Sequence, residues 1–134
     1  MKHWSLFILI ILLAGCGKEN PTASTFKLNE PFEIPYQQVF HNNDQNVSIY
    51  LDSVLYDSRC PLGFLCTWEG NALVRFRFIS NHTVNDLLLN TFKDFRNDTI
   101  INGYKISMVS LAPQPRSGVK TEQQEYKATM VINN

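Results

Sequence analysis

Two cysteines with five residues between them, Cys60 and Cys66, are the side chains of this sequence with the clearest chemical potential. They could form a disulfide, ligate a metal ion or act as a redox pair. Zinc sites prefer cysteines two to four residues apart and a second ligand pair elsewhere, but after the first 15 residues the only histidines are His41 and His82, both in turn-like sequence. A reactive redox pair needs Cys-x-x-Cys spacing, which is absent. We therefore expect a disulfide that closes a short loop, and no metal ion or other cofactor.

The same stretch carries residue types that are common in binding sites. Arg59, Phe64, Trp68 and Glu69 lie within or beside the cysteine loop, and tryptophan and arginine dominate the energetics of many protein interfaces. One interpretation is that these four residues form a recognition tip on a rigid loop. The other, which we favour, is that Asp57 and Arg59 form hydrogen bonds or a salt bridge within the motif and thereby stabilise the loop.

The first 15 residues have the pattern of a bacterial signal peptide. A basic residue, Lys2, precedes an apolar run over residues 6–13, which is too short to span a bilayer because a spanning helix needs about 20 residues. The sequence Leu13-Ala14-Gly15-Cys16 resembles the lipobox of bacterial lipoproteins. This resemblance implies cleavage before Cys16 and attachment of lipid to its sulfur, which would hold the protein at a membrane. The alternative is an ordinary signal peptide followed by a chance cysteine.

These features predict a location and a domain organisation. We expect a lipid-anchored protein of the bacterial cell envelope and, because no aspartate follows Cys16, one of the outer membrane, at its periplasmic or surface face. Residues 16–25 are small and polar, which indicates a flexible tether. A folded domain is then expected over residues 26–134.

Charge and motifs exclude several classes of function. The chain has 12 basic and 12 acidic residues and no basic stripe, so we expect no nucleic-acid partner. It has no Gly-x-Ser-x-Gly elbow, phosphate-binding loop or dinucleotide fingerprint. We therefore expect no catalytic residues and no enzymatic activity.

Alternation of apolar and polar residues predicts strands on both sides of the cysteine loop. Residues 41–46 are polar and indicate a turn, and the run over residues 47–56 then reads as a strand. Its phase shifts near Asp52-Ser53, which predicts a β-bulge. Residues 72–79 give the clearest alternation of the chain, with Ala72, Val74, Phe76 and Phe78 on the core side.

Further strands are predicted towards both ends of the domain. Prolines within residues 31–36 indicate an edge strand or a strand that switches sheets. Residues 84–92 fit a strand or a short helix, and we favour a strand. Asn102-Gly103 predicts a hairpin leading into residues 104–111, and residues 126–132 form a last strand. About seven short strands without a convincing long helix predict an all-β fold, either an antiparallel β-sandwich or a small barrel.

The central motif also carries a family resemblance. Asp-Ser-Arg-Cys-Pro, followed by Cys-x-Trp-x-Gly-Asn-Ala, occupies residues 57–72. With the lipobox, it resembles small uncharacterised lipoproteins of Bacteroidota. The resemblance covers residues 54–78 and, loosely, the last two strands. It implies a location and a topology, and no biochemical activity comes with it.

Three kinds of function are compatible with these observations. The first is a membrane-anchored, non-enzymatic β domain that binds a protein or glycan through loops at one end of a sandwich. The second is a structural envelope component whose open sheet edge accepts an added strand. The third is a protease or hydrolase inhibitor that presents the Cys60–Cys66 loop. A hydrolase is disfavoured because the sequence shows no paired acid and base.

Overall fold

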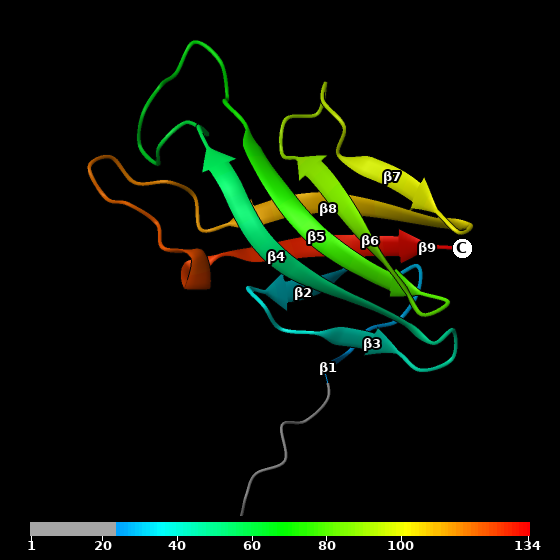
Figure 1. Cartoon of the computed structure of the whole chain (residues 1–134). Helices are drawn as coiled ribbons and strands as arrows, with labels where there is room; N and C mark the ends of the chain where they lie inside the picture. The colour runs from blue at the N-terminus through cyan, green and yellow to red at the C-terminus, as the bar shows by residue number, and fades with distance from the viewer. Residues whose placement is uncertain (1–23) are drawn as a thin grey trace, which may run out of the picture.

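The computed structural model describes residues 24–134, which form nine strands and one short 3₁₀ helix. The strands build two sheets that pack face to face, so the predicted all-β fold is confirmed as a sandwich rather than a closed barrel (Figure 1). The predicted signal peptide, the lipidation site Cys16 and the tether up to residue 23 lie outside the described residues.

The first sheet contains the two strands that flank the cysteine loop. Its order is β1-β3-β4-β5-β6, with bounds β1 (Ser24–Thr25), β3 (Phe40–Asn42), β4 (Val47–Asp57), β5 (Ala72–Ser80) and β6 (Thr83–Asn90). β1 runs parallel to β3, and the other neighbours are antiparallel. Residues 84–92 are therefore mainly strand, as we favoured.

Two boundaries differ from the sequence-based expectation. The tether was expected to reach residue 25, but Ser24 and Thr25 already pair with β3. A turn was expected from residue 41, but β3 extends to Asn42 because its backbone pairs with the start of β4. The Asn42 side chain also donates to the carbonyl of Phe26 at 3.1 Å, which ties the incoming chain to the sheet.

The second sheet closes the sandwich. Its order is β2-β9-β8-β7, with bounds β2 (Phe32–Pro35), β9 (Lys127–Asn133), β8 (Tyr104–Ala112) and β7 (Asp98–Ile101). β2 is an edge strand, as its prolines predicted, and the next residue, Tyr36, bridges to Leu51 in the first sheet. The chain thus crosses between sheets immediately after Pro35. Asn102 and Gly103 both have positive φ, as a two-residue hairpin turn requires.

The core lies between the sheets and includes the four residues of the 72–79 run that the alternation assigned to it. Val47, Ile49 and Leu51 of β4 are buried, as are Ala72, Val74, Phe76 and Phe78 of β5 and Tyr126, Ala128, Met130 and Ile132 at the C-terminal end. Full burial of one large apolar side chain stabilises the fold by about 1.5–3 kcal/mol. The predicted bulge is present, because the β4–β5 register shifts between Leu51 and Ser53.

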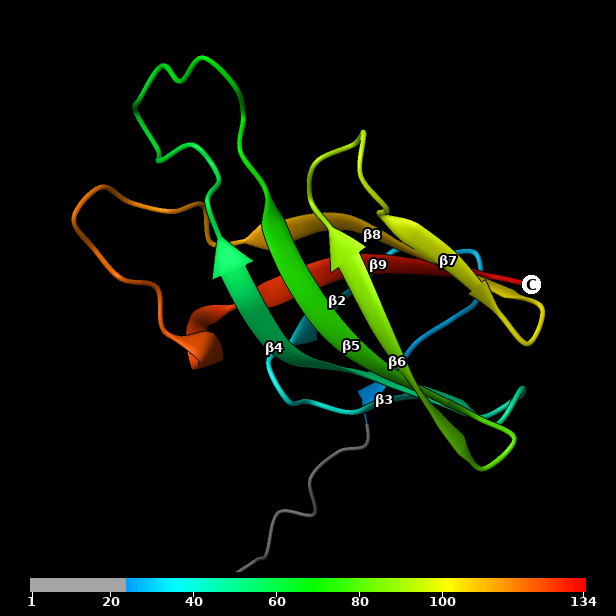
Figure 2. The same cartoon turned by 45° about the horizontal axis from the view of Figure 1, so that its top comes forward.

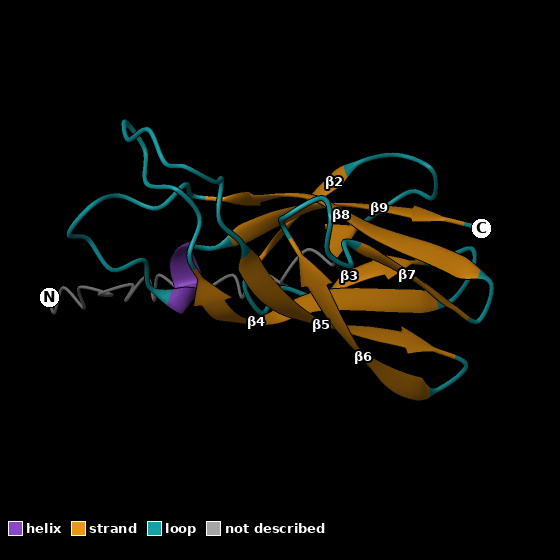
Figure 3. Cartoon of the chain, turned by 90° about the horizontal axis from the view of Figure 1, so that it is seen from above, coloured by secondary structure: helices purple, strands orange, loops and turns teal. Residues whose placement is uncertain are grey.

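Three long loops gather at one end of the sandwich. They are the β4–β5 loop (58–71), which contains the cysteines, the β6–β7 loop (91–97) and the β8–β9 segment (113–126), which includes the 3₁₀ helix Gln123–Glu125 (Figures 1 and 2). The two-residue hairpin turns 81–82 and 102–103 lie at the opposite end, as the view from above also shows (Figure 3). The fold therefore places the cysteine loop beside two other loops.

Candidate functional site

The cysteine loop is closed as predicted. Cys60 and Cys66 form a disulfide, with their Cα atoms 5.9 Å apart. The two ends of the loop also pair with each other, because the Ser58 N–H donates to the Asn71 carbonyl at 2.7 Å and the Cys60 N–H donates to the Glu69 carbonyl at 2.9 Å. The base of the loop is thus a short continuation of the β4–β5 ladder.

Gly70 allows this close pairing at the base. Its φ is +74°, a conformation that side chains with a Cβ rarely adopt, and a Cβ at this position would lie 2.0 Å from the Ser58 carbonyl oxygen. A carbon and an oxygen atom that are not bonded to each other cannot lie this close, so only glycine fits here without a shift of the backbone.

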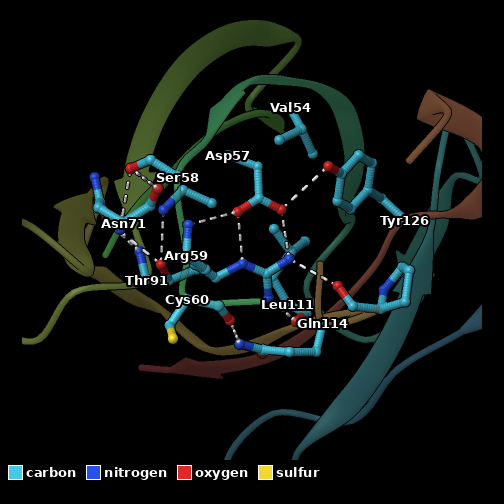
Figure 4. A network of polar contacts seen from close by, with 12 residues as sticks. Val54, Asp57, Ser58, Arg59, Cys60, Asn71, Thr91, Leu111, Gln114 and Tyr126 are labelled. Carbon is cyan, nitrogen blue, oxygen red and sulfur yellow. Dashed lines mark hydrogen bonds and ion pairs between the residues drawn. The ribbon is translucent and has the colours of Figure 1, made fainter. Parts of the chain in front are cut away.

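A buried ion pair between Asp57 and Arg59 lies at the base of the loop. The Arg59 Nε donates to Asp57 Oδ1 at 2.9 Å and its Nη2 donates to Oδ2 at 2.6 Å, in the two-pronged geometry that favours arginine over lysine (Figure 4). The two side chains are only 7 % and 8 % exposed. Arg59 therefore does not lie on the exposed surface of the loop, and its ion pair within the motif fits the interpretation that we favoured.

The ion pair connects the loop to the second sheet. Arg59 donates to the carbonyls of Leu111, at the end of β8, and of Pro113, the latter at 2.7 Å. The Tyr126 hydroxyl, just before β9, donates to Asp57 Oδ2 at 3.1 Å. Burial raises the pKa of Tyr126, and the negative charge of Asp57 and the hydrogen bond to it add to the increase.

Asn71 makes the corresponding connection to the β6–β7 loop. Its amide nitrogen donates to the Tyr56 hydroxyl at 2.9 Å and to Asn90 Oδ1 at 2.8 Å, while its oxygen accepts from the backbone N–H groups of Thr91 and Phe92 at 3.1 and 3.0 Å. The side chain is almost fully buried and all of its polar atoms are used. Our sequence reasoning missed this role of Asn71.

The β8–β9 segment forms a third set of contacts with the loop, which are hydrogen bonds. The Gln114 side chain donates to the Cys60 carbonyl at 2.6 Å, and the Leu62 N–H donates to the Pro115 carbonyl at 2.8 Å. The loop is therefore held by its own disulfide, by a buried ion pair and by hydrogen bonds to both neighbouring loops. Such support limits the number of conformations that the loop can adopt.

The outer part of the loop exposes a group of apolar side chains. We call Leu62, Phe64, Leu65 and Trp68 the apolar tip; they are 68 %, 57 %, 105 % and 53 % exposed. Trp68 packs edge-on against Phe92 of the β6–β7 loop, with ring centroids 5.7 Å apart, and Phe92 packs in the same manner on Phe95. Glu69 is also exposed, and its described contact is the backbone bond to Cys60.

Within residues 24–134, no three His, Cys, Asp or Glu side chains are grouped so that they could hold a metal ion. No helix in the same range has the length and apolar character needed to cross a membrane.

Comparisons with protein-family models, curated proteins and solved structures find no match to this chain.

Proposed function

We propose that this protein is a lipid-anchored envelope lipoprotein whose sandwich domain binds a partner protein through the apolar tip. The observation that carries the proposal is the exposure of four large apolar side chains on a loop that is otherwise tightly held. Exposed apolar side chains that are contiguous on a soluble domain often mark a binding surface. A loop needed only for connection could be shorter and polar.

The rigidity of the loop favours binding over a merely structural role. Binding costs less conformational entropy when the loop that contacts the partner is already held in one conformation. Here the disulfide, the Asp57–Arg59 pair and the Asn71 amide restrain the loop before any partner arrives. The side chains of Leu62, Phe64 and Leu65 are exposed, so most of the apolar surface of the tip is accessible to a partner.

A protein is a better match to this surface than a glycan. Sugar rings carry many hydroxyl groups, which need polar side chains around an aromatic platform. The apolar tip instead combines two leucines with Phe64 and Trp68. Aliphatic and aromatic side chains that are desolvated together are typical of the centre of a protein–protein interface.

The test compares two sets of substitutions in a pull-down from envelope extract. The tip variant is Leu62→Ser/Phe64→Ser/Leu65→Ser, and the control is Ile100→Ser/Val109→Ser, which removes exposed apolar side chains of β7 and β8. We expect wild type and control to retain the same discrete partner, and the tip variant to lose it. A partner retained equally by the tip variant would overturn the proposal. Inhibition of a captured hydrolase would identify the binding as inhibitory.

The lipid anchor needs a separate experiment. Cells that express the full chain are labelled with an alkyne analogue of palmitate, and wild type is compared with Cys16→Ala. We expect label on the wild type and none on the variant, because the thiol of Cys16 is the predicted attachment point. An unlabelled wild type, or equal labelling of both, would refute the anchor without affecting the binding proposal.

A further inference from the structure

The free edge formed by β6 is a second surface with the properties of a binding site. Within residues 24–134, the two sheets end in β1, β6, β2 and β7. β1 has two residues, β7 has four, and β2 ends in Pro35 and follows Pro31. β6 has eight residues and contains no proline, lysine or arginine, and its pairing with β5 shows no bulge. It therefore lacks several devices that usually protect an edge strand.

The hairpin turn determines which backbone groups of β6 face outward. Asn81 and His82 both have positive φ and join the paired residues Ser80 and Thr83, as in a two-residue turn whose closing pair is hydrogen-bonded. Hydrogen-bonded and non-bonded pairs alternate from there. The N–H and C=O groups of Val84, Asp86 and Leu88 therefore point away from β5.

Two observed hydrogen bonds agree with this alternation. Asn90, which follows the same parity, donates its N–H away from β5 to the Arg96 carbonyl at 2.8 Å. Thr91, of the opposite parity, donates its N–H to Ala72 of β5 at 3.0 Å. The β6–β7 loop thus occupies the Asn90 end of the edge. Among the described residues, no other backbone hydrogen bond outside the ladder involves Val84, Asp86 or Leu88.

The side chains of these three residues form an apolar–acidic–apolar row on the outer face. Val84 and Leu88 are exposed, and Asp86 lies between them. Asp86 lies 3.4 Å from Arg77 Nε, but the same nitrogen lies 3.3 Å from Asp52, so one guanidinium serves two carboxylates. The Asp86 side chain remains 57 % exposed at the edge and available to a second cation.

We propose that β6 accepts an extended segment of another protein as an added strand, with a lysine or arginine opposite Asp86 and apolar residues two positions to either side. The outward N–H and C=O groups supply the affinity of such strand addition, and the row of side chains supplies its selectivity. This surface is separate from the apolar tip and does not depend on the proposed function.

The central acid also argues against a second copy of this chain as the occupant. An antiparallel pairing of two β6 edges that uses all three outward residues places Val84 opposite Leu88, and Asp86 opposite Asp86. Like charges directly opposite each other destabilise a strand pair. A strand with a central cation has an attractive pair at the same position, so a different protein fits the edge better.

The test uses an acetylated and amidated peptide, Thr-Val-Thr-Lys-Thr-Val-Thr, at millimolar concentration. It is added to mature chain, residues 16–134, that carries Cys16→Ala to prevent lipidation, and amide hydrogen exchange is followed by NMR. We expect slower exchange at Val84, Asp86 and Leu88, and unchanged exchange at Asn85 and Leu87, whose N–H groups already face β5. Absence of slowing at the first three amides, or equal slowing of both sets, would overturn the proposal.

A charge reversal tests the selectivity. Asp86→Lys should weaken binding of the lysine peptide about fivefold and strengthen binding of the same peptide with a central glutamate by a similar factor, as expected from exchanging an attractive for a repulsive cross-strand pair. The tip variant Leu62→Ser/Phe64→Ser/Leu65→Ser is the matched control and should bind the lysine peptide like wild type. Equal affinity of wild type and Asp86→Lys for both peptides would contradict the proposed role of Asp86.

Discussion

Gly70 shows how a single residue determines the shape of the cysteine loop. Gly70→Ala places a Cβ against the Ser58 carbonyl and also forces alanine into the left-handed region. Gly63→Ala is the matched control, because Gly63 has a similar φ of +82° but no atom near the added Cβ. Left-handed strain alone costs about 1–2 kcal/mol, so we expect Gly70→Ala to lower the free energy of unfolding by clearly more than Gly63→Ala. Urea denaturation measures both, and equal losses would contradict the close approach.

A second prediction concerns the ion pair between Arg59 and Asp57. Arg59→Met leaves the Asp57 carboxylate buried without its cation, and breaking a buried pair in this way costs about 3–5 kcal/mol. Lys127→Met, which removes the partner of the exposed Glu33, is the control and should change stability by at most about 1 kcal/mol. Chemical denaturation at neutral pH provides both values. A loss in Arg59→Met no larger than the control would show that the pair is not a support of the loop.

The raised pKa of Tyr126 predicts how the stability of the fold changes at alkaline pH. Its pKa is raised in the folded protein, so the folded state holds the phenol proton more tightly than the unfolded chain. This contribution is fully present below the unfolded pKa of about 10 and is lost as pH rises through the folded pKa. Tyr126→Phe should be less stable at neutral pH, because the bond to Asp57 is lost, but should lose less additional stability above pH 10. Parallel stability–pH curves for the two proteins would be inconsistent with this role.

Part of the site was predictable at the level of residues. The spacing and setting of Cys60 and Cys66 indicated the disulfide. Asp57 and Arg59 were expected to form hydrogen bonds or a salt bridge within the motif, but the sequence did not identify their partners. The partners of Asn71, by contrast, are Tyr56, Asn90 and the backbone of Thr91 and Phe92. They come together only when the β6–β7 loop folds beside the cysteine loop, and a local pattern contains no information on that contact.

At the scale of the element, the disulfide should stabilise the loop without determining the fold. For a loop of this size the chain-entropy model gives about 2 kcal/mol, whereas the sandwich core and the base of the loop remain in Cys60→Ser/Cys66→Ser. We expect a melting temperature lower by about 8 °C and an unchanged β spectrum in circular dichroism. An unchanged melting temperature would refute the energetic role, and loss of the β spectrum would show that the fold itself needs the bridge.

The strands show why some elements can be read from sequence and others cannot. β4, β5, β8 and β9 have seven or more residues in which apolar and polar side chains alternate, and this alternation identifies each of them. β6 has eight residues, but its run of three leucines breaks the alternation, so its sequence fitted a helix as well. β1 and β3 have two and three residues, too few for a pattern, and they exist because neighbouring backbone pairs with them. The choice between sandwich and barrel was also open, because closure depends on whether edge strands meet, which side-chain alternation does not specify.

At the scale of the whole molecule, the fold separates two proposed surfaces. The apolar tip belongs to the end of the sandwich that carries the three long loops, whereas the β6 edge runs along the side of the first sheet (Figure 2). Each can therefore be changed without altering the other. This separation makes the proposed interactions of the tip and of the edge independently testable.

The most direct measurement of the central claim is photo-crosslinking in living cells. A photoreactive amino acid replaces Leu65, the most exposed residue of the apolar tip, or Val109 of β8 as a control on a strand. We predict a discrete crosslinked protein from position 65 that is absent from position 109 and is lost when Trp68→Ser is added. Absence of a crosslink at position 65, or an identical pattern from both positions, would contradict the claim that the apolar tip binds a partner protein.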